Sequence, residues 1–239
     1  FILMNILIGF DFSINKPACT MVWKDNENII HHLFMIWPLK LTKHENEIYS
    51  SIGDVVLKNR NMDSINTKEL SSSKLTLLHT KRSSSLSAMI VSDMESEIMK
   101  IKNINVGKDK LYVCSEGLSF ASMGNASLNL ATYKAVLMSD LYRQLKTENI
   151  YTFSPLSIKS VAGCARKKDA GEKEAMISAF MKQKDFKSPF RNMLINENKS
   201  MRAKKNYIHC VDDIADSYWA VRTMHDKLKM NDIPEWQNF

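Results

Sequence analysis

The stretch that decides the fold is Leu-Tyr-Val-Cys-Ser-Glu-Gly-Leu-Ser-Phe-Ala-Ser-Met-Gly-Asn, residues 111–125. Its first six residues alternate as in a β-strand, with residues 111, 113 and 115 on one face and 112, 114 and 116 on the other. Glu116 therefore lies where a buried strand ends, directly before Gly117. A single charge at a strand end is common, so Glu116 gains meaning only from the acids elsewhere in the chain.

Three further carboxylates occupy comparable places. Asp11 follows the apolar run 6–10, and Asp213 and Asp216 lie three residues apart in a predicted helix, 211–225. Residues three apart project from the same side of a helix. The dipole at a helix N-terminus favours acids, which explains one aspartate or two but not the acids at two strand ends. The sequence therefore predicts one acidic site, assembled by folding from all four carboxylates.

Composition and charge bound the class of protein. The chain has 239 residues, of which 44% are hydrophobic, and this is enough for one core. It has only 7 glycines and 5 prolines, which disfavours a turn-rich all-β fold. Its net charge is +7. Residues 159–205 hold 13 Lys and Arg against 5 Asp and Glu, a net of +8, so the rest of the chain is close to neutral. A concentrated basic segment is typical of a surface that contacts phosphates.

Cysteine spacing and hydropathy indicate the compartment. The four cysteines lie far apart without a CxxC pair, which disfavours a zinc site or a disulfide framework and favours reduced thiols. No apolar run approaches the roughly 18 residues of a membrane span. Residues 1–3 are too short for a signal peptide, and we expect Met4 to be the natural first residue. The expectation is a soluble, intracellular protein.

The chain order predicts a mixed α/β domain over residues 4–230. Strands are expected at 5–11, 18–23 and 29–37, a helix at 86–101, the strand 111–116, a helix at 127–146 and a strand at 150–153. This order gives a five-stranded sheet, three strands antiparallel and then two parallel, flanked by helices. Residues 40–87 are interpreted as an insertion of short helices and loops, and residues 186–205 as a basic linker. The helix 127–146 is apolar over a broad face, which suits burial against the sheet and against a second subunit.

A family resemblance follows from these motifs. The acidic first strand, Glu116-Gly117, Ser119-Phe120, Gly124-Asn125 and the late Asp-Asp-x-x-Asp helix resemble RuvC-type Holliday junction resolvases, the bacteriophage-type members in particular. Residues 155–173 are similar to the family's serine/lysine/glycine segment before a Glu-Lys helix start. The resemblance covers residues 4–24 and 108–226. The turn Phe12-Ser13 departs from it, because the commoner family turn has proline followed by a small residue.

The resemblance implies an RNase H-like fold, a homodimer, branched DNA as substrate and two divalent metal ions in each active site. Carried over by motif, the catalytic and metal-binding carboxylates are Asp11, Glu116, Asp213 and Asp216, and Lys173 joins the catalytic set. Asp212 is an alternative to Asp213, since residues 212 and 216 also share a helix face. The predicted contacts to DNA are Lys159, Arg166, Lys167, Lys168 and Lys173. A viral source would place the protein in the host cytoplasm.

Electrostatics independently favours a cation at the predicted site. Two like charges about 5 Å apart repel by about 3 kcal/mol at an effective dielectric near 20, so six pairs give about 20 kcal/mol. Typical net stability is about 5–15 kcal/mol. Either some of the carboxyl groups are protonated or cations neutralise them, and an all-oxygen site suits Mg²⁺ or Mn²⁺.

The sequence thus predicts a crossover junction endodeoxyribonuclease, a metal-dependent enzyme that hydrolyses phosphodiester bonds of four-way junctions by a two-metal mechanism. Two alternatives remain at this point. One is another RNase H-like nuclease that cuts RNA–DNA hybrids or flaps. The other is a catalytically inactive DNA-binding scaffold with the same fold.

Overall fold

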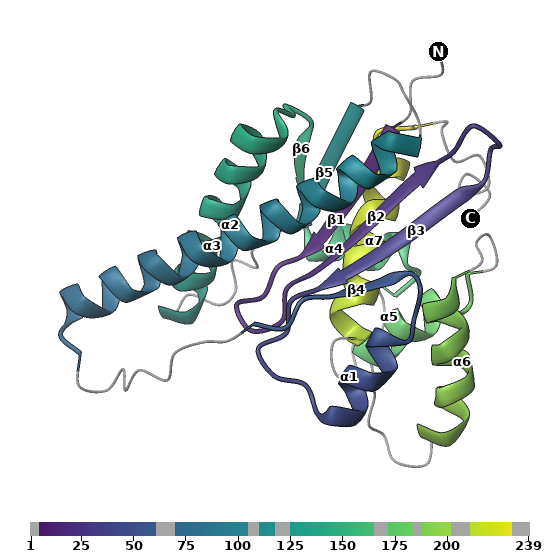
Figure 1. Cartoon of the computed structure of the whole chain (residues 1–239), viewed down its shortest axis with the longest axis horizontal. Coiled ribbons are helices and arrows are strands. Elements are labelled where there is room, and N and C mark those ends of the chain that lie inside the picture. The colour runs from purple at the N-terminus through teal and green to yellow at the C-terminus, as the bar shows by residue number, and fades with distance from the viewer. Residues whose placement is uncertain are drawn as a thin grey trace.

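The computed structural model of the chain describes residues 5–60, 70–104, 110–117, 125–164, 172–183, 188–201 and 211–230. Its sheet has six strands in the order β4-β3-β2-β1-β5-β6 (Figure 1). The strands are β1 (Asn5–Asp11), β2 (Ala18–Lys24), β3 (Ile30–Ile36), β4 (Val55–Leu57), β5 (Lys110–Glu116) and β6 (Ile150–Phe153). The helices are α1 (Lys43–Ser50), α2 (Ser72–Ile104), α3 (Asn125–Leu145), α4 (Pro155–Val161), α5 (Glu172–Met181), α6 (Pro189–Met201) and α7 (Val211–Lys227).

The strand directions confirm the predicted fold class. Strand β1 pairs antiparallel with β2, β2 pairs antiparallel with β3, and β5 and β6 run parallel to β1. The five strands β3-β2-β1-β5-β6 are therefore the mixed sheet of the RNase H-like fold. The predicted count of five strands is wrong by one, because β4 adds a sixth at the edge, parallel to β3. At three residues, β4 is too short to produce an alternating pattern.

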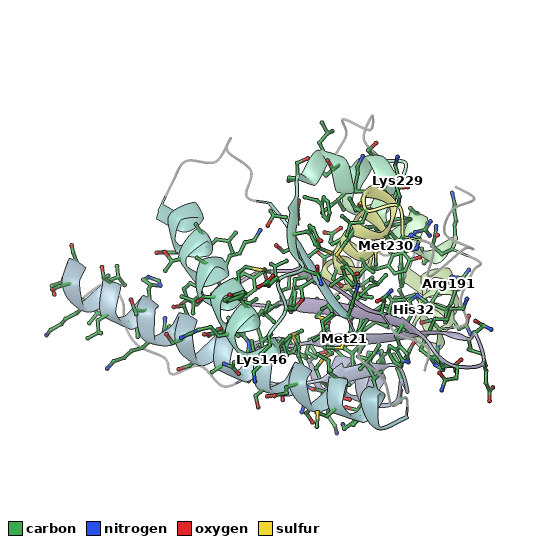
Figure 2. All side chains as sticks on the ribbon, turned by 90° about the horizontal axis from the view of Figure 1, so that it is seen from above. Met21, His32, Lys146, Arg191, Lys229 and Met230 are labelled. Carbon is green, nitrogen blue, oxygen red and sulfur yellow. The ribbon has the colours of Figure 1, made fainter. Side chains whose placement is uncertain are left out.

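Alternation along the strands divides the core into two layers. In β1, Ile6, Ile8 and Phe10 face α2 and α3, whereas Leu7 faces α7. Helix α2 crosses one face of the sheet and α7 lies against the other (Figure 1). Figure 2 shows the same layers from above, with Met21 on the sheet between them. The sheet is thus buried on both faces, as expected where parallel strands are joined by helices.

Two segments differ from their predicted local structure. The helix predicted over 86–101 extends over 72–104. The sequence did not predict its first half because that half is largely exposed and polar and shows no apolar periodicity. Within the segment predicted as a linker, α6 forms and buries Phe190 and Leu194 in the core beside α7. Its start is fixed by Asp54, whose carboxylate accepts hydrogen bonds from the Ser188 hydroxyl at 2.5 Å and the Phe190 N–H at 2.9 Å.

Helix α7 packs closely against β1 because residue 9 of the strand is a glycine. A Cβ atom on Gly9 would be 2.3 Å from the Ser217 carbonyl oxygen and 2.8 Å from the Val221 nitrogen. Beside this contact, the buried hydroxyls of Thr20 and Ser217 are hydrogen-bonded at 2.7 Å. The glycine therefore permits the close approach of the two backbones, and the Thr20–Ser217 hydrogen bond fixes the position of α7 along the strands.

No helix in the described part of the chain combines the length and the apolar character that crossing a bilayer requires.

The contact at Gly9 gives a testable prediction. Gly9→Ala is expected to lower the free energy of unfolding by about 3 kcal/mol or more, because the new methyl group meets backbone atoms of α7, which cannot rotate away. Gly53→Ala is the matched control, since a Cβ at Gly53 has no atom within 4 Å. Urea unfolding of both variants measures the difference. Equal stabilities of the two variants would contradict the close packing of α7 on β1.

Candidate active site

Two of the predicted acids end neighbouring parallel strands. Asp11 is the last residue of β1 and Glu116 the last of β5, and the register pairs Phe10 with Ser115 one position earlier. Because the strands are parallel, their carboxyl ends meet at one edge of the sheet. By alternation both acids lie on the α7 face, in step with Leu7 and Cys114 of the core on that side.

Helix α7 brings the other two acids to the same place. Asp213 and Asp216 lie in its first two turns, and Asp213 is only 5% exposed. The pKa of Asp11 is raised well above its ordinary value, first by burial and then by the negative charges of Asp216, Asp213 and Glu116. Folding therefore places the other three predicted carboxylates within electrostatic reach of Asp11.

A lysine that the sequence did not single out completes one side of the cluster. The Lys16 ammonium lies 2.8 Å from Asp213 Oδ2 and donates to Asp212 Oδ1 at 3.0 Å and Oδ2 at 3.2 Å. Burial alone lowers the pKa of Lys16, but its hydrogen bonds and ion pairs with Asp213 and Asp212 outweigh this and raise the pKa overall. For Asp213, burial and the charge of Asp212 dominate over Lys16 and raise the pKa to about 6.

Two more cations lie beside Glu116. Lys134 of α3 is 9% exposed and donates to the Glu116 backbone carbonyl, and burial lowers its pKa against the charges of Glu116 and Asp11. Lys159 of α4 is half-buried. Burial raises the pKa of Glu116, and the charges of Lys159 and Lys134 partly offset that shift. Of these two lysines, only Lys159 was predicted from the sequence. The sequence does hold one signal that could have found Lys134: this charged residue follows Tyr133 on the apolar side of the predicted helix.

The remaining predicted DNA contacts lie outside the description of the structure. Arg166, Lys167 and Lys168 fall in the range 165–171, which is not described. Lys173 lies in the first turn of α5, whose backbone is described there but whose side chain is not. Their assigned roles stay predictions.

The donor set fits a hard divalent cation by its chemistry. It consists of carboxylate oxygens, the ligands that Mg²⁺ and Mn²⁺ prefer. The pKa of Asp11, raised by burial and by the charges of the other three acids, indicates that the folded chain disfavours their joint ionisation. Among the described residues, no three acidic, histidine or cysteine side chains already converge in the arrangement needed to hold an ion. One oxygen of Asp213 instead forms an ion pair with Lys16.

The chain is similar to several solved structures at low sequence identity. The chain is similar to Thermus thermophilus RuvC in complex with a Holliday junction substrate, at 8% identity over 95% of this chain and 96% of that chain, with a TM-score of 0.47. It is similar to the yeast mitochondrial Holliday junction resolvase Ydc2, at 11% identity, 91% and 75% coverage and a TM-score of 0.43. Fowlpox virus resolvase in complex with Holliday junction DNA matches at 13% identity, 93% and 98% coverage and a TM-score of 0.39. No protein-family model and no curated protein sequence matches the chain.

The raised pKa of Asp213 predicts how stability depends on pH without metal. The folded protein holds this proton more tightly than the unfolded chain, so the carboxyl group becomes destabilising as pH rises from about 4 through about 6. Asp213→Asn cannot ionise and is expected to exceed the wild type in stability at pH 8 by about 1–3 kcal/mol. The difference shrinks as the pH falls towards 4.

Urea unfolding in EDTA at several pH values measures this difference. Asp226→Asn, at the exposed end of the same helix, is the control for loss of a charge. A destabilised Asp213→Asn variant at pH 8 would contradict the assignment of Asp213 as an acid held in an unfavourable place.

Proposed function

We propose that the chain is a metal-dependent, structure-selective DNA endonuclease that resolves four-way (Holliday) junctions, that is, a crossover junction endodeoxyribonuclease. The observation that carries the proposal is that Asp11 and Glu116 end neighbouring parallel strands at one edge of the sheet, against which α7 packs Asp213 and Asp216, so that the charges of the other three acids raise the pKa of Asp11. The motif around Glu116, which resembles that of RuvC-type resolvases, supports junctions as the substrate.

The four carboxylates are the residues that would hold one or two Mg²⁺ or Mn²⁺ ions. When bound, such ions activate water and stabilise charge on the oxygens of the phosphodiester. Asp11 and Glu116 are fixed by the strands that carry them, and Asp213 and Asp216 by the close packing of α7. Lys159, half-buried on the Glu116 side, is suited to contact the phosphate that approaches the acids.

The site itself favours an enzyme over an inactive scaffold. Gathering four carboxylates in one place opposes folding, and the pKa of Asp11, raised by burial and by the charges of the other three, reflects that opposition. A scaffold that only binds DNA has no need of such a cluster. A nuclease for hybrids or flaps uses the same acids, so only a comparison of substrates separates it from a resolvase.

A homodimer through α3 is part of the proposal. Two identical sites related by a two-fold axis suit a junction whose opposite strands must both be cut. The apolar stripe Tyr133, Leu137 and Leu141 is buried within the chain against α2 and the sheet, so these residues are not available to a second subunit. The association surface must therefore use the opposite side of α3, where Tyr142 is 53% exposed.

Removing single ligands tests the proposed chemistry. Asp11→Asn, Glu116→Gln, Asp213→Asn and Asp216→Asn are each expected to slow cleavage of a four-way junction in Mg²⁺ by about 100-fold or more, because each removes a charged oxygen from the cation site. Junction affinity should remain, since the basic residues are unchanged. Cleavage rates and gel-shift titrations measure the two effects separately.

Asp212→Asn is the internal control, expected to cut at nearly the wild-type rate, since Asp212 pairs with Lys16 at the margin of the cluster. The wild type should make paired incisions in junctions and spare hybrids, flaps and duplexes. Faster cutting of hybrids or flaps would favour the alternative nuclease. Near-normal cutting by any of the four variants would remove that residue from the ligand set.

The basic segment gives a separate prediction about affinity. Replacing Arg166, Lys167 and Lys168 by alanine is expected to weaken junction binding and to reduce the slope of log K against log salt by about 0.9 per lost phosphate contact. Binding titrations from low to moderate salt measure this slope. An unchanged slope would show that the three side chains make no phosphate contact.

A further inference from the structure

The β1–β2 turn delivers an ammonium group to the acidic cluster from the opposite end of the sequence. Lys16 and Asp213 are 197 positions apart, yet Lys16 Nζ lies 2.8 Å from Asp213 Oδ2. The same nitrogen contacts both carboxylate oxygens of Asp212. One cation therefore bridges two consecutive acids of α7.

The turn that carries Lys16 is held by its own network of hydrogen bonds. The Lys16 N–H donates to the Ser13 hydroxyl at 3.0 Å. Three turn carbonyls accept bonds from the segment after β3: Ile14 from Arg60 Nη2 at 2.7 Å, Asn15 from Leu39 N at 3.0 Å, and Pro17 from Trp37 N at 3.1 Å. Arg60 is itself buried and also donates to the Trp37 carbonyl at 2.6 Å. The backbone around Lys16 is therefore anchored on both sides of the residue.

The Asp213 oxygen that contacts the ammonium belongs to a proposed ligand of the cation. Asp213 is 5% exposed, and the Lys16 side chain is 24% exposed, so water screens their interaction only in part. A divalent cation held by this oxygen would be repelled by the positive charge of Lys16. The two positive groups therefore oppose each other at Asp213.

We propose that Lys16 is a positioning residue that holds Asp213 beside Asp11 in the metal-free protein and competes with the divalent cation for the Asp213 carboxylate. Lys16 has this role only if the four carboxylates bind a cation, as the proposed function requires. The ion pairs of Lys16 with Asp212 and Asp213 offset the repulsion between the acids in the metal-free protein, and they set the metal affinity lower than four carboxylates alone would give.

Two measurements on protein free of DNA test the role. In EDTA, Lys16→Met is expected to melt several degrees below the wild type, because the acids lose their internal cation. In a calorimetric titration with Mn²⁺, the variant is expected to bind about ten-fold more tightly, because no ammonium opposes the ion. Lys16→Arg, which retains the charge, should restore melting and affinity towards the wild-type values.

Controls keep the outcomes distinct. Lys43→Met removes a charge from an exposed site and should leave both measurements unchanged, since the Lys43 side chain is 93% exposed. Lys16→Gln, which keeps polar donors without the charge, replaces Lys16→Met if that variant does not fold. Mn²⁺ affinity that is unchanged or weaker in the uncharged variant overturns the competition, and so does unchanged melting in EDTA. A wild type that binds no Mn²⁺ overturns the proposed metal site itself.

Discussion

The close contact between α7 and β1 is the constraint on which the rest of the site depends. Only glycine at position 9 lets the helix backbone approach the strand this closely, and the Thr20–Ser217 hydrogen bond fixes the helix along the sheet. Asp216 directly precedes Ser217, and Asp213 lies one helical turn before Ser217. The packing of the uncharged residues Gly9, Thr20 and Ser217 therefore decides where two acids lie relative to Asp11. The position of these carboxylates follows from core packing, because mutual repulsion alone would separate them.

The acidic cluster opposes folding, and the chain offsets this with cations from separate elements. Lys16 comes from the β1–β2 turn, Lys134 from α3 and Lys159 from α4. These ammonium groups lie around the acids, and they leave the pKa values of Asp11 and Asp213 raised. A site that remains unfavourable after such compensation is typical of function rather than stability. The proposed divalent cation would add the positive charge that the lysines do not supply.

The sequence predicted the parts of the structure that depend on local pattern. Alternation in 5–11 and 111–116 gave the strands and the face on which Asp11 and Glu116 lie, and helical spacing gave α7. It did not predict β4, which has three residues, or the first half of α2, which is largely exposed and polar. Lys16 was missed because its partners are almost 200 residues away. Lys134 was missed because its bond to the Glu116 carbonyl depends on how α3 packs against β5.

The central claim is that folding builds one cation site from Asp11, Glu116, Asp213 and Asp216. Anomalous diffraction from crystals soaked in Mn²⁺ tests it most directly, because manganese is located independently of any assumption about ligands. The account predicts an anomalous peak at the edge of the sheet where β1 and β5 end, within coordination distance of Asp11 and at least two of the other three carboxylates. Manganese bound elsewhere, with these carboxylates free of it at saturating concentration, would contradict the account.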